Sequence, residues 1–116
     1  MNTAELKAIA LKYTPINVRA IHINNNYPLQ GRATYFFSDD HYELYVPRPN
    51  TLRRLLFFLH ECSHAYLEHK GNAMATETEA WNRVKEICRI EHIELMDKDI
   101  RLIDHTLEYS KCKLTT

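Results

Sequence analysis

Residues 53–69 read Arg-Arg-Leu-Leu-Phe-Phe-Leu-His-Glu-Cys-Ser-His-Ala-Tyr-Leu-Glu-His, an apolar run that contains the pattern His60-Glu61-x-x-His64. On an α-helix, positions four apart differ by about 40° around the axis, so both imidazoles leave one face and can share a metal ion. Glu61 lies about 100° round from His60, where it can act as a base without ligating the metal. This pattern is typical of zinc hydrolases.

The other side chains of this segment indicate a helix that is buried on one side. With His60 placed at 0°, the apolar side chains fill an arc of roughly 160° to 340°, and Phe57 is the one apolar residue on the opposite side. The polar residues on that side are Arg53, His60, Glu61, His64 and Glu68. A buried helix that turns two histidines and a glutamate toward one cleft is explained more economically by a metal than by core histidines.

Capping residues set the expected limits of this helix. Asn50 or Thr51 can accept a backbone N–H at its start. The helix should run to about His69, and Gly71-Asn72 should terminate it.

Two further helices are predicted after the motif. Thr76 caps the first, with Glu79 in the capping-box position, and this helix should run to about Glu94. Its apolar stripe consists of Ala80, Trp81, Val84, Ile87, Cys88 and Leu95. The last helix should start at Asp97 or Lys98 and run to about Ser110.

The residues before the motif predict one helix and one strand. Residues 3–13 indicate a short amphipathic helix that Thr14-Pro15 ends. Residues 17–24 indicate a strand. Residues 24–31 are dense in turn formers and predict a loop.

A hairpin is predicted from two β-rich runs, residues 32–38 and 41–46, which meet at Ser38-Asp-Asp. Pro47 and Pro49 stop the second run and suggest that it is an edge strand. The order of elements predicts an α+β domain with a small antiparallel three-stranded sheet packed on the motif helix.

Length and composition indicate a single globular domain over residues 1–116. The chain is 45% hydrophobic and 26% charged, with Lys+Arg and Asp+Glu balanced at 15 each. This balance gives no support for a nucleic-acid-binding or membrane-surface protein. The N-terminus has no basic segment followed by an apolar core, and no apolar run approaches about 18 residues, so we expect a cytoplasmic protein. Cys62, Cys88 and Cys112 are odd in number and widely spaced, which favours reduced thiols.

A zinc hydrolase needs a third protein ligand and an open position for water. The metzincin spacing would place a histidine at the position of Lys70, so that arrangement fails. On a continuous helix His69 lies roughly 180° from His60, and we expect it to cap the helix C-terminus instead.

Glu77 and Glu79, near the start of the following helix, are the better candidates for the third ligand. They differ by roughly 200° around the helix axis, so only one can face the metal. Glu77 shares its side with the apolar stripe that includes Trp81, whereas Glu79 points outward. We therefore favour Glu77 and keep Glu79 as the alternative, because a divalent cation would offset the cost of burying a carboxylate.

The motif region resembles the core of the ImmA/IrrE-like (DUF955-type) zinc metallopeptidases. The shared pattern is an apolar run into H-E-x-x-H, a short loop, and E-x-E-A-N at a helix start, which reads Glu77-Thr-Glu-Ala-Trp81 in this chain. The likeness covers residues 32–84 and includes the hairpin before the motif helix. Trp81 stands where the family usually has Asn, and the helix-turn-helix module of many relatives is not seen in this sequence.

The resemblance implies a zinc-dependent peptidase in which His60, His64 and Glu77 hold the ion and Glu61 is the general base. A regulatory protein of a mobile element or stress system is the substrate class that it implies. An extended substrate would pair with the edge strand expected at residues 42–46. Side chains of the type that stabilise an oxyanion are Tyr66, His92, His105 and Tyr109.

Two alternatives stay open at this point. One is a zinc-binding inhibitor or adaptor of a phage, plasmid or toxin system that has no turnover, which the small size and Trp81 favour. The other is a SprT-like protease acting at DNA, which the balanced charge does not support. Oligomeric state is open.

Overall fold

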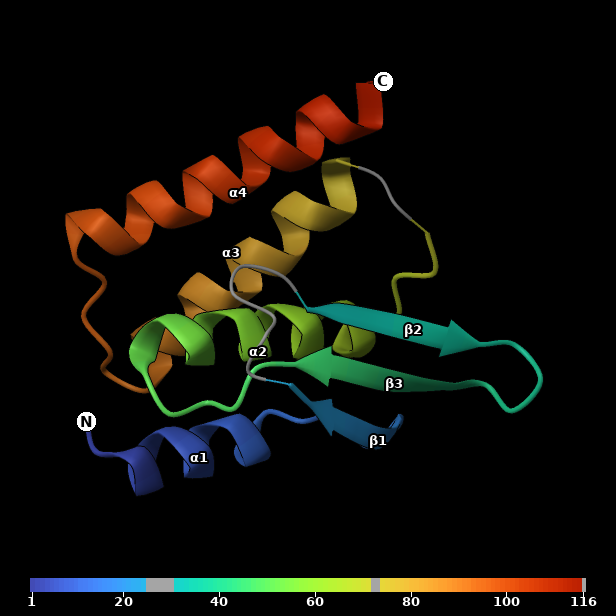
Figure 1. Cartoon of the computed structure of the whole chain (residues 1–116), viewed down its shortest axis with the longest axis horizontal. Coiled ribbons are helices and arrows are strands. Elements are labelled where there is room, and N and C mark those ends of the chain that lie inside the picture. Colours follow the sequence, from blue (N-terminus) through green and yellow to red (C-terminus); the bar gives the residue numbers. More distant parts are fainter. Residues whose placement is uncertain (25–30, 72–73, 116) are drawn as a thin grey trace. The chain divides into compact units, whose positions relative to one another are not determined.

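The structure, a computed structural model, describes residues 1–24, 31–71 and 74–115. Its elements follow the predicted order and confirm the α+β class (Figure 1). They are α1 (Thr3–Lys12), β1 (Val18–Ile23), β2 (Arg32–Phe36), β3 (His41–Val46), α2 (Leu52–Tyr66), α3 (Met74–Ile90) and α4 (Asp97–Thr115). The chain divides into two compact units, Met1–Lys70 and Gly71–Thr116. The predicted loop at residues 24–31 lies, apart from its two end residues, outside the described residues.

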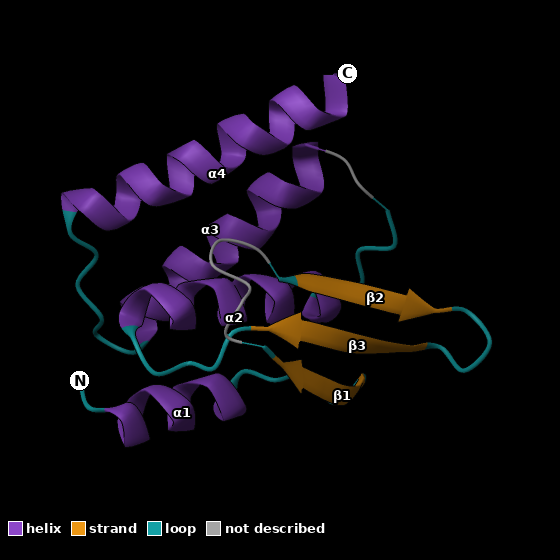
Figure 2. Cartoon of the chain, viewed as in Figure 1, coloured by secondary structure: helices purple, strands orange, loops and turns teal. Residues whose placement is uncertain are grey.

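The first unit contains a three-stranded sheet with the strand order β1-β3-β2 (Figure 2). β2 and β3 form the predicted antiparallel hairpin, in which Arg32 pairs with Tyr45. β1 runs parallel to β3, with Ile21 beside Leu44. The sheet is therefore mixed, and the antiparallel arrangement predicted for all three strands is wrong. Local β propensity cannot give strand direction, because direction depends on the path of the chain between strands.

β3 is the central strand, and this corrects the prediction that residues 41–46 lie at a sheet edge. Pro47 follows Val46, the last residue of the strand. Its missing N–H therefore removes no hydrogen bond from the ladder, and the prolines end the strand without limiting its neighbours. The edge strands are β1 and β2.

The core of the first unit lies between β3 and α2. Tyr42, Leu44 and Val46 alternate along β3 and are buried, as period-two patterning requires. α2 packs against β3 and β2, while α1 packs against α2 and buries Leu6 and Ala10. The apolar residues that α2 buries are Leu55, Leu56, Phe57, Phe58, Leu59, Cys62 and Ala65. Each large one contributes about 1.5–3 kcal/mol of burial free energy, which fixes α2 on the sheet.

The limits of α2 differ from the prediction at one end. Thr51 caps its start, as predicted, by accepting a backbone N–H with its hydroxyl. The helix ends at Tyr66, because Glu68 adopts a left-handed φ of 58°. The His69 N–H then reaches back to the His64 carbonyl at 3.0 Å, which is the bond that closes a Schellman motif. The helix therefore ends before His69, and the predicted Gly-Asn pair is not the terminator.

The second unit consists of α3 and α4, which pack against each other. The buried residues of α3 match the predicted stripe and are Ala80, Trp81, Val84, Ile87 and Cys88. Thr76 lies inside the helix and does not cap it, because the helix already includes Met74. α3 ends at Ile90, short of the predicted end near Glu94. Two residues later, His92 takes a left-handed φ of 58°.

α4 begins at Asp97, as predicted, and continues to Thr115 instead of ending near Ser110. The Asp99 carboxylate accepts the backbone N–H of Met96 at 2.9 Å, which satisfies a donor at the helix start. Neither α4 nor any other helix within the described residues is long and apolar enough to cross a membrane.

The cysteines agree with the prediction of reduced thiols as far as the structure describes them. Cys62 and Cys88 are buried and form no disulfide. Burial, together with the nearby Asp99 carboxylate, raises the pKa of the Cys88 thiol to about 11. The thiol therefore stays protonated and unreactive at neutral pH. The Cys112 side chain lies outside the described part of the chain.

Candidate metal centre

His60 and His64 extend from the same side of α2, one turn apart, as the motif spacing predicts. Their Nε2 atoms are 3.2 Å apart, and their rings are nearly perpendicular, with 79° between the planes. Two nitrogens bound tetrahedrally to one zinc at 2.0–2.1 Å would be about 3.3 Å apart. The pair therefore already has the separation that a shared metal requires.

Glu61 follows His60 on the helix and is also buried, with 5% of its surface exposed. The backbone at Gly31, just before β2, passes close beside it. A Cβ atom at position 31 would lie 3.1 Å from Glu61 Cγ and 2.3 Å from the Tyr45 carbonyl oxygen. The edge strand β2 therefore starts next to the predicted base. The sequence predicts that Gly31 ends a loop, and it carries no signal for this contact, because the contact joins residues distant in the chain.

His69 lies beside His64, which the sequence-based prediction of opposite sides did not anticipate. The His64 and His69 Nδ1 atoms are 2.9 Å apart, and the ring centroids are 5.1 Å apart. The prediction assumed a helix continuous to His69, but the chain reverses at Glu68 and brings the imidazole back. Local sequence gives no signal for this reversal, because a left-handed residue at a helix end is usually glycine.

The Tyr42 hydroxyl holds the backbone of His69 in place. It donates to the His69 carbonyl oxygen at 2.8 Å, from the fully buried side of β3. Burial raises the pKa of Tyr42 to about 12, with a smaller contribution from the Glu68 carboxylate. The hydroxyl is therefore a donor throughout the physiological pH range.

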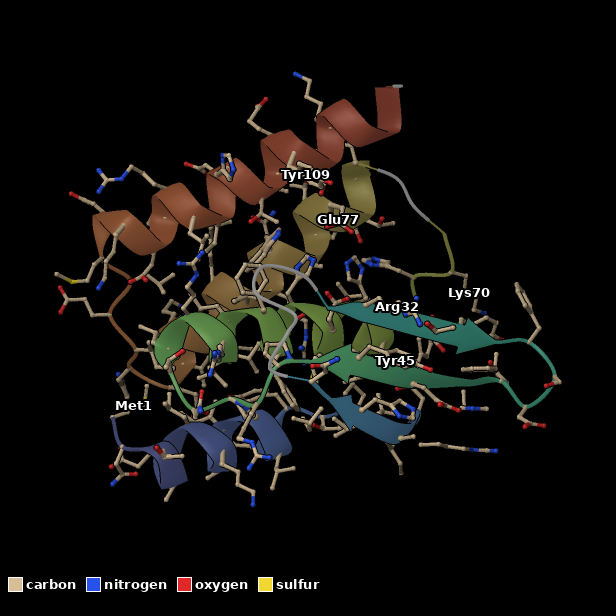
Figure 3. The ribbon with its side chains drawn as sticks, viewed as in Figure 1. Met1, Arg32, Tyr45, Lys70, Glu77 and Tyr109 are labelled. Carbon is tan, nitrogen blue, oxygen red and sulfur yellow. The ribbon has the colours of Figure 1, made fainter. Side chains whose placement is uncertain are left out.

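Glu77, the predicted third ligand, lies in the first turn of α3 in the second unit (Figure 3). It is half-buried, whereas the alternative Glu79 is exposed. Among the described residues, one group of three His, Cys, Asp or Glu side chains could hold a metal ion, and it consists of His60, His64 and Glu77. The group does not identify the metal.

Trp81 is fully buried on α3, so the predicted phase of that helix is confirmed. The four residues named as possible oxyanion donors lie at different places. Tyr66 ends α2 and is exposed, as are Tyr109 and His105 on α4 and His92 after α3. Their proposed role stays a prediction.

A second group of histidines lies on the sheet. His22 Nε2 is 2.8 Å from one oxygen of Glu43, and His41 Nε2 is 3.2 Å from the other. These two hydrogen bonds hold the pKa of Glu43 below its usual range. An aromatic contact adjoins the group, since His22 stacks on Tyr45 with 4.5 Å between the ring centroids.

Tyr45 connects this part of the sheet with β2. The Arg32 guanidinium lies 4.4 Å from the centroid of its ring (Figure 3), within the range of a cation–π contact.

Comparison with protein-family models, with curated proteins and with solved structures finds no match to this chain. The chemistry of the site is therefore inferred from its own residues: two neighbouring imidazoles, a buried carboxylate on the same helix and a further carboxylate on α3.

Proposed function

We propose that this protein is a small zinc-dependent metallopeptidase. His60, His64 and Glu77 would hold the ion, and Glu61 would act as the general base. The observation that carries the proposal is the 3.2 Å separation of the two Nε2 atoms on the helix that also carries the buried Glu61. Core histidines that merely fill space have no need of such a pairing.

The donor set supports zinc over other divalent ions. Two imidazoles and one carboxylate, with a fourth position left open, is an arrangement of catalytic zinc sites. Ions such as calcium and magnesium prefer oxygen ligands. When bound, zinc supplies Lewis-acid polarisation of a carbonyl group and lowers the pKa of water, and both serve hydrolysis.

The position of Glu61 supports its proposed role as general base. Glu61 follows a proposed ligand by one residue, so it would lie beside the ion without binding it. It would take a proton from water and deliver it to the leaving amine, which is typically worth about 10²–10⁴-fold in rate.

The edge of β2 is the best place for an extended peptide. Residues 42–46, which the sequence suggested, have both neighbours filled because β3 is central. β2 is an edge strand, and the chain enters it at Gly31 beside Glu61. A peptide added to that edge would run close to the base, with backbone hydrogen bonds giving affinity and little sequence selectivity.

The test compares wild type with Glu61→Gln on a dye-labelled unfolded protein as substrate. Zinc-loaded wild type should cleave it, and Glu61→Gln should be at least about 100-fold slower while it keeps its zinc. A Glu61→Gln variant that is as active as wild type would refute the proposed role. A protein of the regulatory class that the resemblance implies can be tested next in the same assay.

One observation favours a second candidate, a zinc-binding inhibitor or adaptor without turnover. Trp81 is fully buried where the resembling family carries a polar residue, so an indole fills the place of that side chain. Outer-shell partners of metal ligands often matter 10–100-fold in activity. Zinc binding without cleavage of any unfolded protein by wild type would support this candidate.

A further inference from the structure

We propose that His69 is a positioning residue for the metal ligand His64. This inference rests on the metal site of the proposed function, although it does not require that the site be a peptidase. The decisive contact is the 2.9 Å distance between the two Nδ1 atoms.

The chemistry of imidazole determines where the proton in this contact must lie. A neutral imidazole carries one N–H, and its other nitrogen has a lone pair. If His64 Nε2 binds a metal, its proton must be on Nδ1. His69 Nδ1 must then be the acceptor, and its own proton must be on Nε2. With a metal on Nε2, this hydrogen bond would hold His64 in the tautomer that binds the metal, and it would also orient the ring.

The backbone holds His69 in this position from two sides. Its N–H donates to the His64 carbonyl at 3.0 Å, and its carbonyl accepts the Tyr42 hydroxyl at 2.8 Å. The left-handed turn at Glu68 makes both contacts possible. These bonds fix the backbone of residue 69, from which the imidazole reaches His64, and they do not depend on a metal.

A role limited to capping the helix does not account for the ring contact. The cap uses the backbone N–H of residue 69, which any residue but proline supplies. Only a side chain with an acceptor at the position of Nδ1 can receive the His64 proton. Asparagine offers an amide oxygen two bonds beyond Cβ, in nearly the same place, whereas phenylalanine offers a ring of similar size with no acceptor.

The experiment measures zinc affinity by competition with a chromophoric chelator, without substrate. His69→Phe should bind zinc about 10–100-fold more weakly than wild type, and His69→Asn should stay within a few-fold of wild type. The Co²⁺-substituted protein should show an altered visible spectrum in His69→Phe and a near-native one in His69→Asn. His22→Phe, which removes a histidine from the sheet of the same unit, is the matched control and should leave zinc affinity unchanged.

Melting curves of the chelator-treated proteins show whether each variant is folded. Wild-type affinity in His69→Phe would overturn the inference, and so would equal losses in the Phe and Asn variants, because the acceptor would then be irrelevant. Absence of zinc binding by wild type would overturn both proposals. If wild type and His69→Asn both bind zinc tightly but wild type cleaves no substrate, only the proposed peptidase activity would be refuted.

Discussion

The first unit holds two groups of histidines, which differ in the atoms that lie next to their ring nitrogens. In the helix cluster (His60, His64 and His69) ring nitrogens face ring nitrogens, at 3.2 Å and 2.9 Å. In the sheet cluster (His22, His41 and Glu43) each histidine presents Nε2 to one oxygen of a shared carboxylate.

The difference decides what each cluster can bind. In the sheet cluster, a proton on each Nε2 lets both carboxylate oxygens accept a hydrogen bond. Two neutral imidazoles can instead turn two lone pairs toward one point when each carries its proton on the other ring nitrogen, which is the arrangement that a metal ion requires. The partner atoms, and not the number of histidines, therefore distinguish the candidate metal site from the histidine–carboxylate group on the sheet.

The largest effect should come from removing a ligand of the helix cluster. Wild type should hold about one zinc per chain, and His60→Ala combined with His64→Ala should lose it, since two of three ligands are gone. His41→Ala in the sheet cluster should keep it. Metal content after dialysis, measured by plasma mass spectrometry, tests the contrast. Full zinc in the double variant, or its loss in His41→Ala, would erase the distinction between the clusters.

A second prediction concerns Glu77, the proposed third ligand, which lies on α3 and is not part of the helix cluster. Glu77→Ala should weaken zinc binding more than about 100-fold, beyond the range of outer-shell changes, while Glu79→Ala should have almost no effect because Glu79 is exposed. Competitive zinc titration of both variants provides the comparison. The reverse order would make Glu79 the third ligand.

A third prediction uses the hydroxyl that supports the helix cluster. Tyr42→Phe should cost about 0.5–1.5 kcal/mol of unfolding free energy at neutral pH through the lost hydrogen bond. The folded pKa of about 12 lies above the unfolded value near 10, so the stabilisation is complete below about pH 10 and disappears as pH rises through 12. Urea unfolding from pH 9 to 12 should therefore show a steeper loss in wild type than in Tyr42→Phe. Parallel curves would contradict the burial of this hydroxyl.

The smallest effect is expected in the sheet cluster. Because hydrogen bonds from His22 and His41 lower the pKa of Glu43, its contribution to stability is present above the unfolded carboxyl pKa and is lost as pH falls through the folded pKa. Below about pH 4.5 wild type should thus lose slightly more stability than Glu43→Gln, while zinc affinity at neutral pH stays the same. Acid titration followed by circular dichroism tests this, and a change in zinc affinity would connect the two clusters.

Much of this arrangement can be predicted from sequence because it depends on periodicity. The turn-spaced His60 and His64, the alternation along β3 and the buried side of α3 that includes Trp81 are all found as predicted. Each follows from the repeat of a helix or a strand.

The features that sequence does not reveal depend on single backbone angles or on distant contacts. The chain has only two glycines, and Glu68 and His92 take the left-handed positions that glycine usually marks. α2 and α3 are consequently predicted too long, and His69 is assigned to the wrong side of the helix. The direction of β1 is likewise set by the chain path and carries no local signal.

The close passage of the chain at Gly31 limits which residues can occupy this position during evolution. Its φ is ordinary, so the backbone angle does not demand glycine, but even a methyl group would meet the Tyr45 carbonyl at 2.3 Å. Any other residue at position 31 should therefore displace the start of β2 or the backbone of Tyr45. We therefore expect distant relatives that keep the pairing of β2 with β3 to keep this glycine as well.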